Sequence, residues 1–288
     1  MTVTRALSRG LTRSTRRFKA LLIVWASNLI YAGLVAVPVL FLIQSSLGTS
    51  LSGDTVRPFD VDWLADMFYG HQAAGPAWLG LVAAAVPAYA LLTVLLSGGL
   101  AGRLLDTDGE TTLQEFLSDC GRYFLPFIKL AVFWAFCLFL GLGFVWSLLS
   151  RLTNQAAGNA HSEWPVVILS VVKAAVILLL LSVLRLFLDY ARIIMVTENE
   201  RRLFKSLRLG AASLKGRFFK AWLLYLLLAL FASAGTLVGI FIARRLAHPG
   251  GVALALGVVG MQAYIVFRVL ARSLFITAQA EFLKGQPF

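Results

Sequence analysis

The segment "VVILSVVKAAVILLLLSVLRLFLDYARIIMVTENE", residues 166–200, decides the class of fold. It opens with a long aliphatic run that Lys173 interrupts, and it ends in a polar, charged tail. A helix needs about 20 consecutive apolar residues to cross the hydrocarbon core of a bilayer. The segment therefore predicts a transmembrane helix over 165–190 that leaves the membrane in a charged connector.

Five further apolar runs of comparable length occur along the chain, and little sequence is left for a soluble domain. Hydrophobic residues make up 59% and charged residues 14% of the 288 residues, whereas soluble domains carry about a quarter charged residues. We predict an all-α, polytopic membrane protein with a basic N-terminal segment, 1–19, and one transmembrane domain, 20–288. The predicted spans are 20–43, 77–102, 123–149, 165–190, 218–243 and 252–278.

The length of the first apolar run and the distribution of Lys and Arg predict how the chain is placed in a membrane. The first apolar run is longer than the roughly 7–15 residues of a signal-peptide core, so we expect a retained span. Of the 26 Lys and Arg residues, 21 fall on the side of the two termini, four on the other side, and Lys173 within a span. Cytoplasmic loops are enriched in Lys and Arg. The distribution predicts a multi-pass protein of the cytoplasmic (inner) membrane with both termini in the cytoplasm.

The end of the quoted segment recurs twice elsewhere. "AGRLLDTDGE" at 101–110, "ARIIMVTENE" at 191–200 and "ARSLFITAQAE" at 271–281 each begin with Ala, continue with Arg and reach Thr a few residues later. Each follows an even-numbered span. This pattern predicts three tandem helical hairpins of one orientation. The alternative is that apolar chains with Arg at a cytoplasmic boundary resemble one another by coincidence.

The starts of the odd-numbered spans are also alike. They read "RRFKALL" from Arg16, "GRYFLPF" from Gly121 and "GRFFKAW" from Gly216. The first and third starts match further, because Leu7, Gly10, Arg17 and Phe18 recur 200 residues later. We expect an amphipathic segment before each odd span. Arg17, Arg122 and Arg217 should then occupy equivalent interfacial positions, as should Arg103, Arg192 and Arg272 at the ends of the even spans.

The connector between the fourth and fifth spans, "NERRLFKSLRLGAASLKGRFF" (199–219), predicts an in-plane amphipathic helix. Apolar residues from Leu203 to Leu214 recur at helical spacing, and basic residues lie mostly off that stripe. Helices of this kind bind the interface of anionic membranes. The expected contacts with anionic lipid are Arg201, Arg202, Lys205, Arg208, Lys215 and Arg217.

Lys173 is the most deeply placed charge in any predicted span, and Asn28 lies at a comparable depth in the first span. Charged groups inside membranes are costly and frequently functional. One interpretation is that Lys173 and Asn28 belong to an intramembrane polar site for an anionic group. The other is that Lys173 extends to the interface or hydrogen-bonds between helices.

A second group of charges lies nearer the cytoplasmic side. Arg185, Asp189 and Arg192 fall at i, i+4 and i+7 on one helical face, and Arg268 and Arg272 are four residues apart on the sixth span. We expect Asp189 to pair within its own helix and across to the sixth span. Such pairs can set the register of packed helices, so we predict a structural charge network.

Sequence signatures of common catalytic and cofactor sites are missing. The chain has no P-loop, HExxH, GxSxG or dinucleotide fingerprint. His71, His161 and His248 are widely separated and lack the spacing of metal ligands. We predict no enzyme activity, no cofactor and no metal site.

Several passages resemble a loose bacterial group of six-span membrane proteins. They are the glycine-containing end of the second span, the "EFL…GRYF" connector and "DYARIIMVTENE…LRLGAASLKGRFF". The group includes the membrane domain fused to some glycerophosphodiester phosphodiesterases. The resemblance implies a bacterial cytoplasmic-membrane protein, but the phosphodiesterase domain has no counterpart in this chain, so its activity does not carry over.

These observations favour a non-enzymatic integral membrane protein that acts as a scaffold or accessory subunit. The expected partners are membrane lipids, mainly anionic ones, together with a membrane protein or a second copy of the chain. No nucleic acid partner is expected. The alternative function is a transporter or lipid-handling protein with a polar intramembrane site near Lys173.

Overall fold

The computed structural model describes residues 3–47, 74–106, 111–158, 164–246 and 251–284. Every regular element within these ranges is helical, which confirms the all-α prediction. The elements are α1 (Val3–Arg16), α2 (Phe18–Leu47), α4 (Ala74–Leu105), α5 (Leu113–Cys137), the π-helix η2 (Leu138–Leu142), α6 (Gly143–Gly158), α7 (Trp164–Thr197), α8 (Leu203–Leu214), α9 (Phe218–Leu246) and α10 (Gly251–Lys284).

Six helical stretches among the described residues are long and apolar enough to cross a membrane, as predicted. They extend further than the apolar runs, because the repeated passages are themselves helical: α7 continues to Thr197 and α10 to Lys284. The six stretches are Phe18–Phe41, Trp78–Leu105, Leu113–Gln155, Trp164–Thr197, Phe218–Arg244 and Ala255–Lys284.

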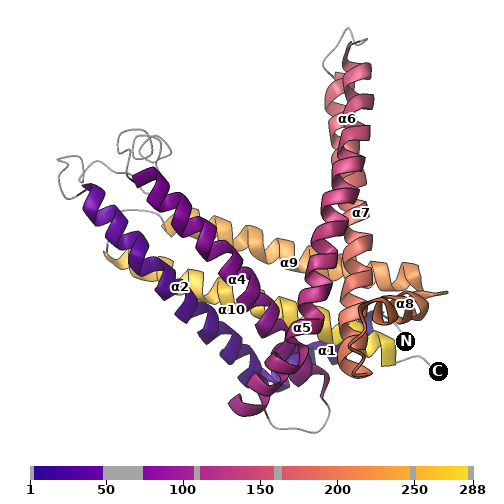
Figure 1. Cartoon of the computed structure of the whole chain (residues 1–288), viewed down its shortest axis with the longest axis horizontal. Helices are drawn as coiled ribbons and strands as arrows, with labels where there is room; N and C mark the ends of the chain where they lie inside the picture. The colour runs from indigo at the N-terminus through magenta and orange to yellow at the C-terminus, as the bar shows by residue number, and fades with distance from the viewer. Residues whose placement is uncertain (1–2, 48–73, 107–110, 159–163, 247–250, 285–288) are drawn as a thin grey trace.

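Buried side chains gather at one end of the molecule. They occupy the starts of α2, α5 and α9 and the ends of α4, α7 and α10. The spans therefore alternate in direction. The same end holds α1 and α8, and α1 packs along the end of α10, so the two ends of the described chain lie together (Figure 1). We call this end the basal layer; it comprises α1, α8 and the six helix ends just named.

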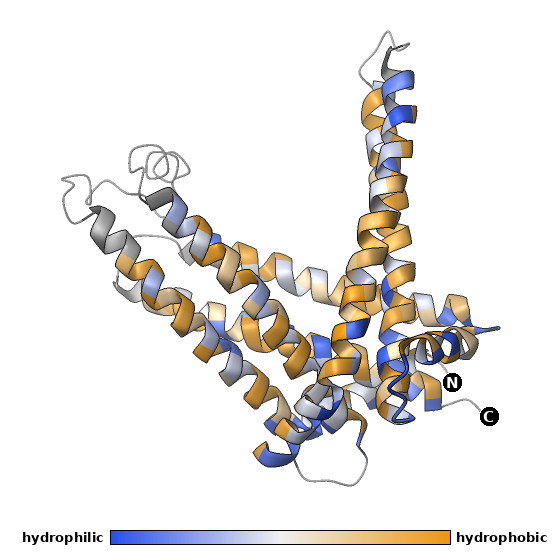
Figure 2. Cartoon of the chain, viewed as in Figure 1, coloured by the Kyte–Doolittle hydropathy of each residue, from blue (hydrophilic) through white to orange (hydrophobic). Residues whose placement is uncertain are grey.

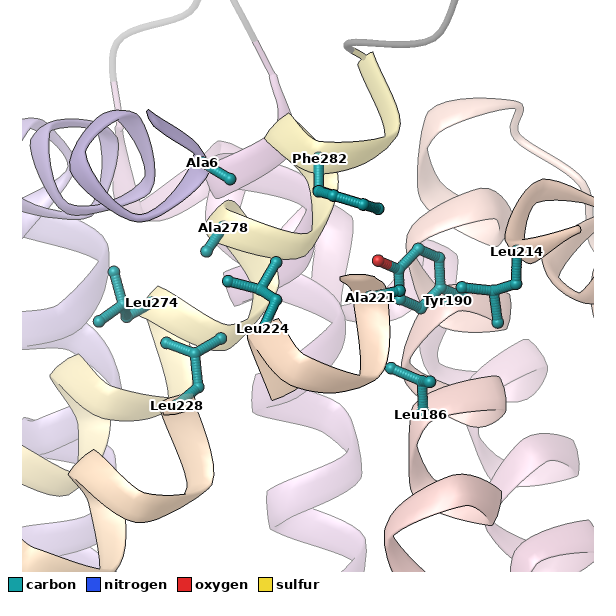
Figure 3. Packing of buried hydrophobic residues seen from close by; sticks show 10 residues of the cluster. All are labelled: Ala6, Leu186, Tyr190, Leu214, Ala221, Leu224, Leu228, Leu274, Ala278 and Phe282. Atoms are coloured by element: carbon teal, nitrogen blue, oxygen red, sulfur yellow. The ribbon is translucent and has the colours of Figure 1, made fainter. Parts of the chain in front are cut away.

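The basal layer contains the hydrophobic core of the protein. Figure 3 shows part of it, where side chains from α1, α7, α8, α9 and α10 meet. Tyr190, Leu224 and Phe282 are fully buried there. Farther out along the helices, apolar side chains such as Leu34 and Phe139 are 69% and 81% exposed. Figure 2 shows these apolar surfaces along the helices, while polar residues concentrate in the basal layer. Lipid tails are as apolar as leucine, so spans need no protein cover within a bilayer.

The spans form two arms that converge on the basal layer (Figure 1). One arm is the continuous run α5–η2–α6 packed against α7, and the other comprises α2, α4, α9 and α10. Tyrosine and tryptophan side chains bridge helices of the second arm. The Tyr31 hydroxyl donates to the Ala85 carbonyl at 2.5 Å, and Trp25 Nε1 donates to Gln262 Oε1 at 3.1 Å. The arms meet where α5 packs on α4 and where α7 contacts α4, α9 and α10.

The contacts between helices bear on the predicted repeat. Each pair of spans predicted to form a hairpin is in contact: α2 with α4, α6 with α7, and α9 with α10. The most extensive contact, however, joins α4 to α5 across a predicted hairpin boundary. A Cβ atom added to Gly99 or Gly102 would overlap Cys120 or Asp119 of α5. The glycines therefore explain this closeness, and the equivalence of the three hairpins stays a prediction.

The amphipathic segments before the odd spans each pack on the end of an even span. The helix α1 packs on α10, the start of α5 packs on α4, and α8 packs on α7. Two of them are separate helices, as expected for interfacial connectors. The second differs, because its residues form the first turns of α5 after a capping box made by Thr112 and Glu115.

Gly10 and Gly210, which recur at a separation of 200 residues, each pack closely against the backbone of an even-numbered span. A Cβ atom on Gly10 would lie 2.8 Å from the backbone nitrogen of Ala278, and one on Gly210 would lie 3.2 Å from that of Ala191. Both alanines belong to the repeated passages. Ala191 is the first residue of its passage and Ala278 the eighth of its own, so the two contacts are about two helical turns out of register and the equivalence of these segments stays a prediction.

Replacing Gly10 with valine should detach or displace α1. The new side chain would meet backbone atoms of Ala278 that cannot move alone, and overpacking of this kind costs about 1–3 kcal/mol. Thermal unfolding in detergent should therefore occur at a lower temperature than for the wild type. Gly33→Val is the matched control, because a Cβ atom at Gly33 meets nothing within 4 Å. Equal destabilisation by both substitutions would contradict the close contact.

Candidate functional site: a cationic cavity between the arms

A cavity of about 740 Å³ lies where the two arms meet. Side chains from α4, α5, α7, α9 and α10 line it. The wall is mostly aliphatic and aromatic, with residues such as Trp134, Leu181 and Phe267. All five residues of the predicted charge network are also part of the lining: Arg185, Asp189, Arg192, Arg268 and Arg272.

The charges on α7 interact with one another along a single helical face. Asp189 Oδ1 lies 3.8 Å from Arg185 Nε and 3.6 Å from Arg192 Nη1. These distances are those of ion pairs without short hydrogen bonds. Asp189 is largely buried, whereas about half of the Arg185 side chain is exposed. One carboxylate therefore serves two guanidinium groups.

The charges on α10 are placed differently. Arg268 lies beside the ring of Tyr264, with Cζ 5.9 Å from the ring centroid. Arg272 is half-buried, and the charges of Arg192, Arg185 and Asp189 all act on it. No carboxylate in the described part of the chain lies within ion-pair distance of Arg268 or Arg272. The expected pair between Asp189 and the sixth span is thus not formed, because Asp189 stays with its own helix.

Two residues of the lining have buried polar atoms without partners in the structure. Both amide atoms of Gln279, Nε2 and Oε1, are buried and make no hydrogen bond, and the residue is only 1% exposed. The Nε atom of Arg192 is likewise buried and unpaired. Buried polar groups are nearly always hydrogen-bonded, and an unpaired one costs about 1–3 kcal/mol. Gln279 and Arg192 thus hold hydrogen-bonding capacity that the described protein groups do not use.

The arrangement as a whole is suited to binding an anion that carries an apolar tail. Guanidinium groups bind phosphate and carboxylate through paired hydrogen bonds. The aliphatic and aromatic wall can accommodate hydrocarbon, and the cavity opens between helices whose outer faces are apolar. A cationic cavity at this depth is costly without a counter-anion, because charges interact strongly in a medium of low dielectric constant.

The structure does not bring Lys173 and Asn28 together. Lys173 Nζ donates to Ser150 Oγ at 2.6 Å and lies 3.6 Å from the ring centroid of Trp146, both on α6. Asn28 Nδ2 donates to the Val24 carbonyl of its own helix at 2.8 Å. The two residues belong to different arms (Figure 1). The contacts of Lys173 agree with the alternative interpretation, in which it bonds between helices.

The basic residues of the connector between the fourth and fifth spans lie around α8 in the basal layer. Arg201, Arg202, Lys205, Arg208 and Lys215 are exposed, and Arg217 is half-buried.

The face of α8 that packs on α7 carries Ser206, Gly210 and Leu214, and Leu203 and Leu207 contact a neighbouring core cluster. Phe204, expected on the packing stripe, is 75% exposed. One of the basic side chains has an acidic partner: Lys205 Nζ hydrogen-bonds the Glu200 carboxylate at 2.5 Å and thereby lowers the pKa of Glu200.

The roles of three residues could not be predicted from the sequence: Gln279 in the cavity lining, and Arg13 and Arg103 in contacts between helices. Gln279 lies within a repeated passage, but an uncharged residue there gave no signal. Arg13 donates to the Leu104 carbonyl at 2.6 Å and to Glu281 at 2.7 Å, which ties α1 to α4 and α10. Arg103 pairs with acidic residues at the start of α5. The partners of Arg13 and Arg103 lie far away in sequence or across a connector, so the spacing of residues in the sequence could not reveal these contacts.

Comparison with known proteins adds no further assignment. No protein-family model, curated protein or solved structure matches this chain. The likeness to the six-span domain of some glycerophosphodiester phosphodiesterases therefore stays a sequence-based expectation. The three histidines considered as metal ligands, His71, His161 and His248, lie outside the described residues.

Proposed function

We propose that the protein is a non-enzymatic, multi-pass protein of the bacterial cytoplasmic membrane that binds an anionic lipid in the cavity between α7 and α10. One observation carries this proposal: Gln279 and Arg192, which hold buried polar atoms without partners, line the same cavity as Arg272, which has no carboxylate partner among the described residues. Asp189 is the only carboxylate among the described lining residues, and two arginines engage it, which favours binding over catalysis.

This proposal combines the scaffold and the lipid-handling protein expected from the sequence. It places the polar site away from Lys173. A lipid-binding scaffold or accessory subunit needs an anionic lipid as partner, and the lipid-handling alternative needs an intramembrane polar site. The site is centred on Arg192 and Arg272 and not on Lys173. The ammonium group of Lys173 is already occupied by Ser150 and Trp146.

The orientation of the protein is part of the proposal, with the basal layer facing the cytoplasm. The support is the concentration of Lys and Arg at this end of the spans. A periplasm-dependent reporter, such as alkaline phosphatase, fused after Phe288 should give no activity, whereas a fluorescent protein fused there should fluoresce. Phosphatase activity from the C-terminal fusion would overturn the orientation.

Lipid binding can be measured on the full chain in nanodiscs of neutral lipid that contain a small fraction of anionic lipid. Native mass spectrometry should detect anionic lipid retained above its fraction in the disc. Arg192→Gln should weaken retention at least about tenfold, because a hydrogen bond to a charged group is worth about 1.5–3 kcal/mol.

Arg9→Gln is the matched control, because Arg9 is exposed on α1 and is not part of the cavity lining. It should leave retention unchanged. Equal loss in both variants would mean that general surface charge holds the lipid. No enrichment of anionic lipid by the wild type would refute the proposed function.

A further inference from the structure

We infer that the ligand of the cavity is an amphiphile that ends in a terminal phosphate, as a phosphomonoester or diphosphate, and carries about two negative charges. This inference rests on the proposed function and specifies its ligand. It starts from the charge of the described lining, which holds four guanidinium groups and one carboxylate, a formal charge of +3.

A ligand with one negative charge would leave much of this charge uncompensated. Asp189 already serves Arg185 and Arg192 at 3.8 and 3.6 Å, so Arg268 and Arg272 depend on the ligand for a counter-charge. A phosphodiester or a carboxylate supplies a single charge. A phosphomonoester carries about −1.5 to −2 charges at neutral pH and offers three acceptor oxygens, which several guanidinium groups can share.

The cations also form two levels along the helices. Arg185 and Arg192 are seven residues apart on α7, and Arg268 and Arg272 are four apart on α10. At 1.5 Å per residue these separations correspond to about 10 Å and about 6 Å. The inner level, Arg192 and Arg272, is the one nearer Gln279 and the basal layer. A terminal phosphate held there directs the rest of the ligand toward Arg185 and Arg268 and then outward along the arms.

The apolar wall distinguishes an amphiphile from free phosphate. Leu178, Leu181 and Phe267 line the outer part of the cavity, on the side away from the basal layer. Free phosphate would make no apolar contact with these side chains. A hydrocarbon tail would cover them and continue into the bilayer between the arms, with each buried methylene contributing about 0.8 kcal/mol.

The inference predicts a dependence of binding on pH that comes from the ligand. The second ionisation of a phosphomonoester has a pKa of about 6, so affinity should be about tenfold higher near pH 8 than near pH 5. The ionisable and charged groups that face this position from the surrounding helices are Asp189, the four arginines and Tyr225 on α9. A phosphodiester lipid measured at the same two pH values reports any contribution from them.

The experiment compares phosphatidic acid, phosphatidylglycerol and inorganic phosphate with the wild-type protein in phosphatidylcholine nanodiscs. Phosphatidic acid should bind at least about tenfold more tightly than phosphatidylglycerol near pH 8 and lose this advantage near pH 5. Inorganic phosphate at the same concentration should not displace it. Gln279→Leu, which keeps every charge, should weaken phosphatidic acid binding, and Arg9→Gln should not.

Three results would overturn the inference. Tight, pH-independent binding of both lipids would show a general anionic-lipid site and leave the proposed function intact. Displacement of phosphatidic acid by equimolar inorganic phosphate would identify a site for free phosphate. Retention of neither lipid above phosphatidylcholine would refute the inference and the proposed function together.

Discussion

Replacing Arg103 with alanine is expected to lower the free energy of unfolding by about 3–5 kcal/mol. Arg103 Nε donates to Asp119 Oδ2 at 2.7 Å and Nη1 donates to Glu115 Oε2 at 3.1 Å. Asp119 is only 7% exposed and faces Gly102, whose lack of a side chain lets the carboxylate approach α4. Without Arg103, this buried carboxylate would lose its main counter-charge and the contact between α4 and α5 would weaken.

Unfolding in detergent, followed by intrinsic tryptophan fluorescence during denaturant titration, measures the effect. Arg122→Ala is the control in the basal layer. Arg122 is exposed, and its Cζ lies 5.6 Å from the centroid of the Tyr123 ring. It should cost less than about 1 kcal/mol. The double variant Arg103→Met with Asp119→Asn should recover much of the loss. A double variant as unstable as Arg103→Ala would show that packing, and not charge, holds this contact.

Replacing Arg272 with methionine should have two effects of opposite direction. In lipid-free protein it should raise the melting temperature, because it removes a cation held near Arg192 and Arg185 without a carboxylate of its own. It should also abolish stabilisation by anionic lipid. Lipid at 100 times its dissociation constant stabilises a protein by about 2.7 kcal/mol. A variant with about 100-fold weaker affinity would gain only about 0.4 kcal/mol under the same conditions.

The measurement is the melting temperature of wild-type and variant protein with and without the lipid. Arg9→Met serves as the control, since it removes one cation from an exposed position on α1. A variant less stable than wild type in the absence of lipid would assign Arg272 to a structural network, as the sequence first indicated. A variant that keeps the full lipid-dependent gain would exclude Arg272 from the site.

The sequence by itself determined the all-α class and the six long apolar helices of the described chain. Long apolar runs predict helices because an apolar helix is the form in which a single segment satisfies its backbone hydrogen bonds inside a bilayer. The repeated passages located the ends of the even spans, and Gly10 and Gly210 marked two segments that each pack closely against an even span. These features are local or periodic, so they can be identified without knowing which helices are neighbours.

The tertiary structure decided which polar groups meet. Arg13 and Glu281 are at opposite ends of the chain yet lie 2.7 Å apart, and Arg103 finds its partners across a connector. The charges of α7 and α10 were recognised as a group, but the sequence could not show that a cavity separates them or that Gln279 joins them. Such a site depends on the angle at which two arms converge, and that angle is fixed by close packing in the basal layer between helices that are distant in sequence.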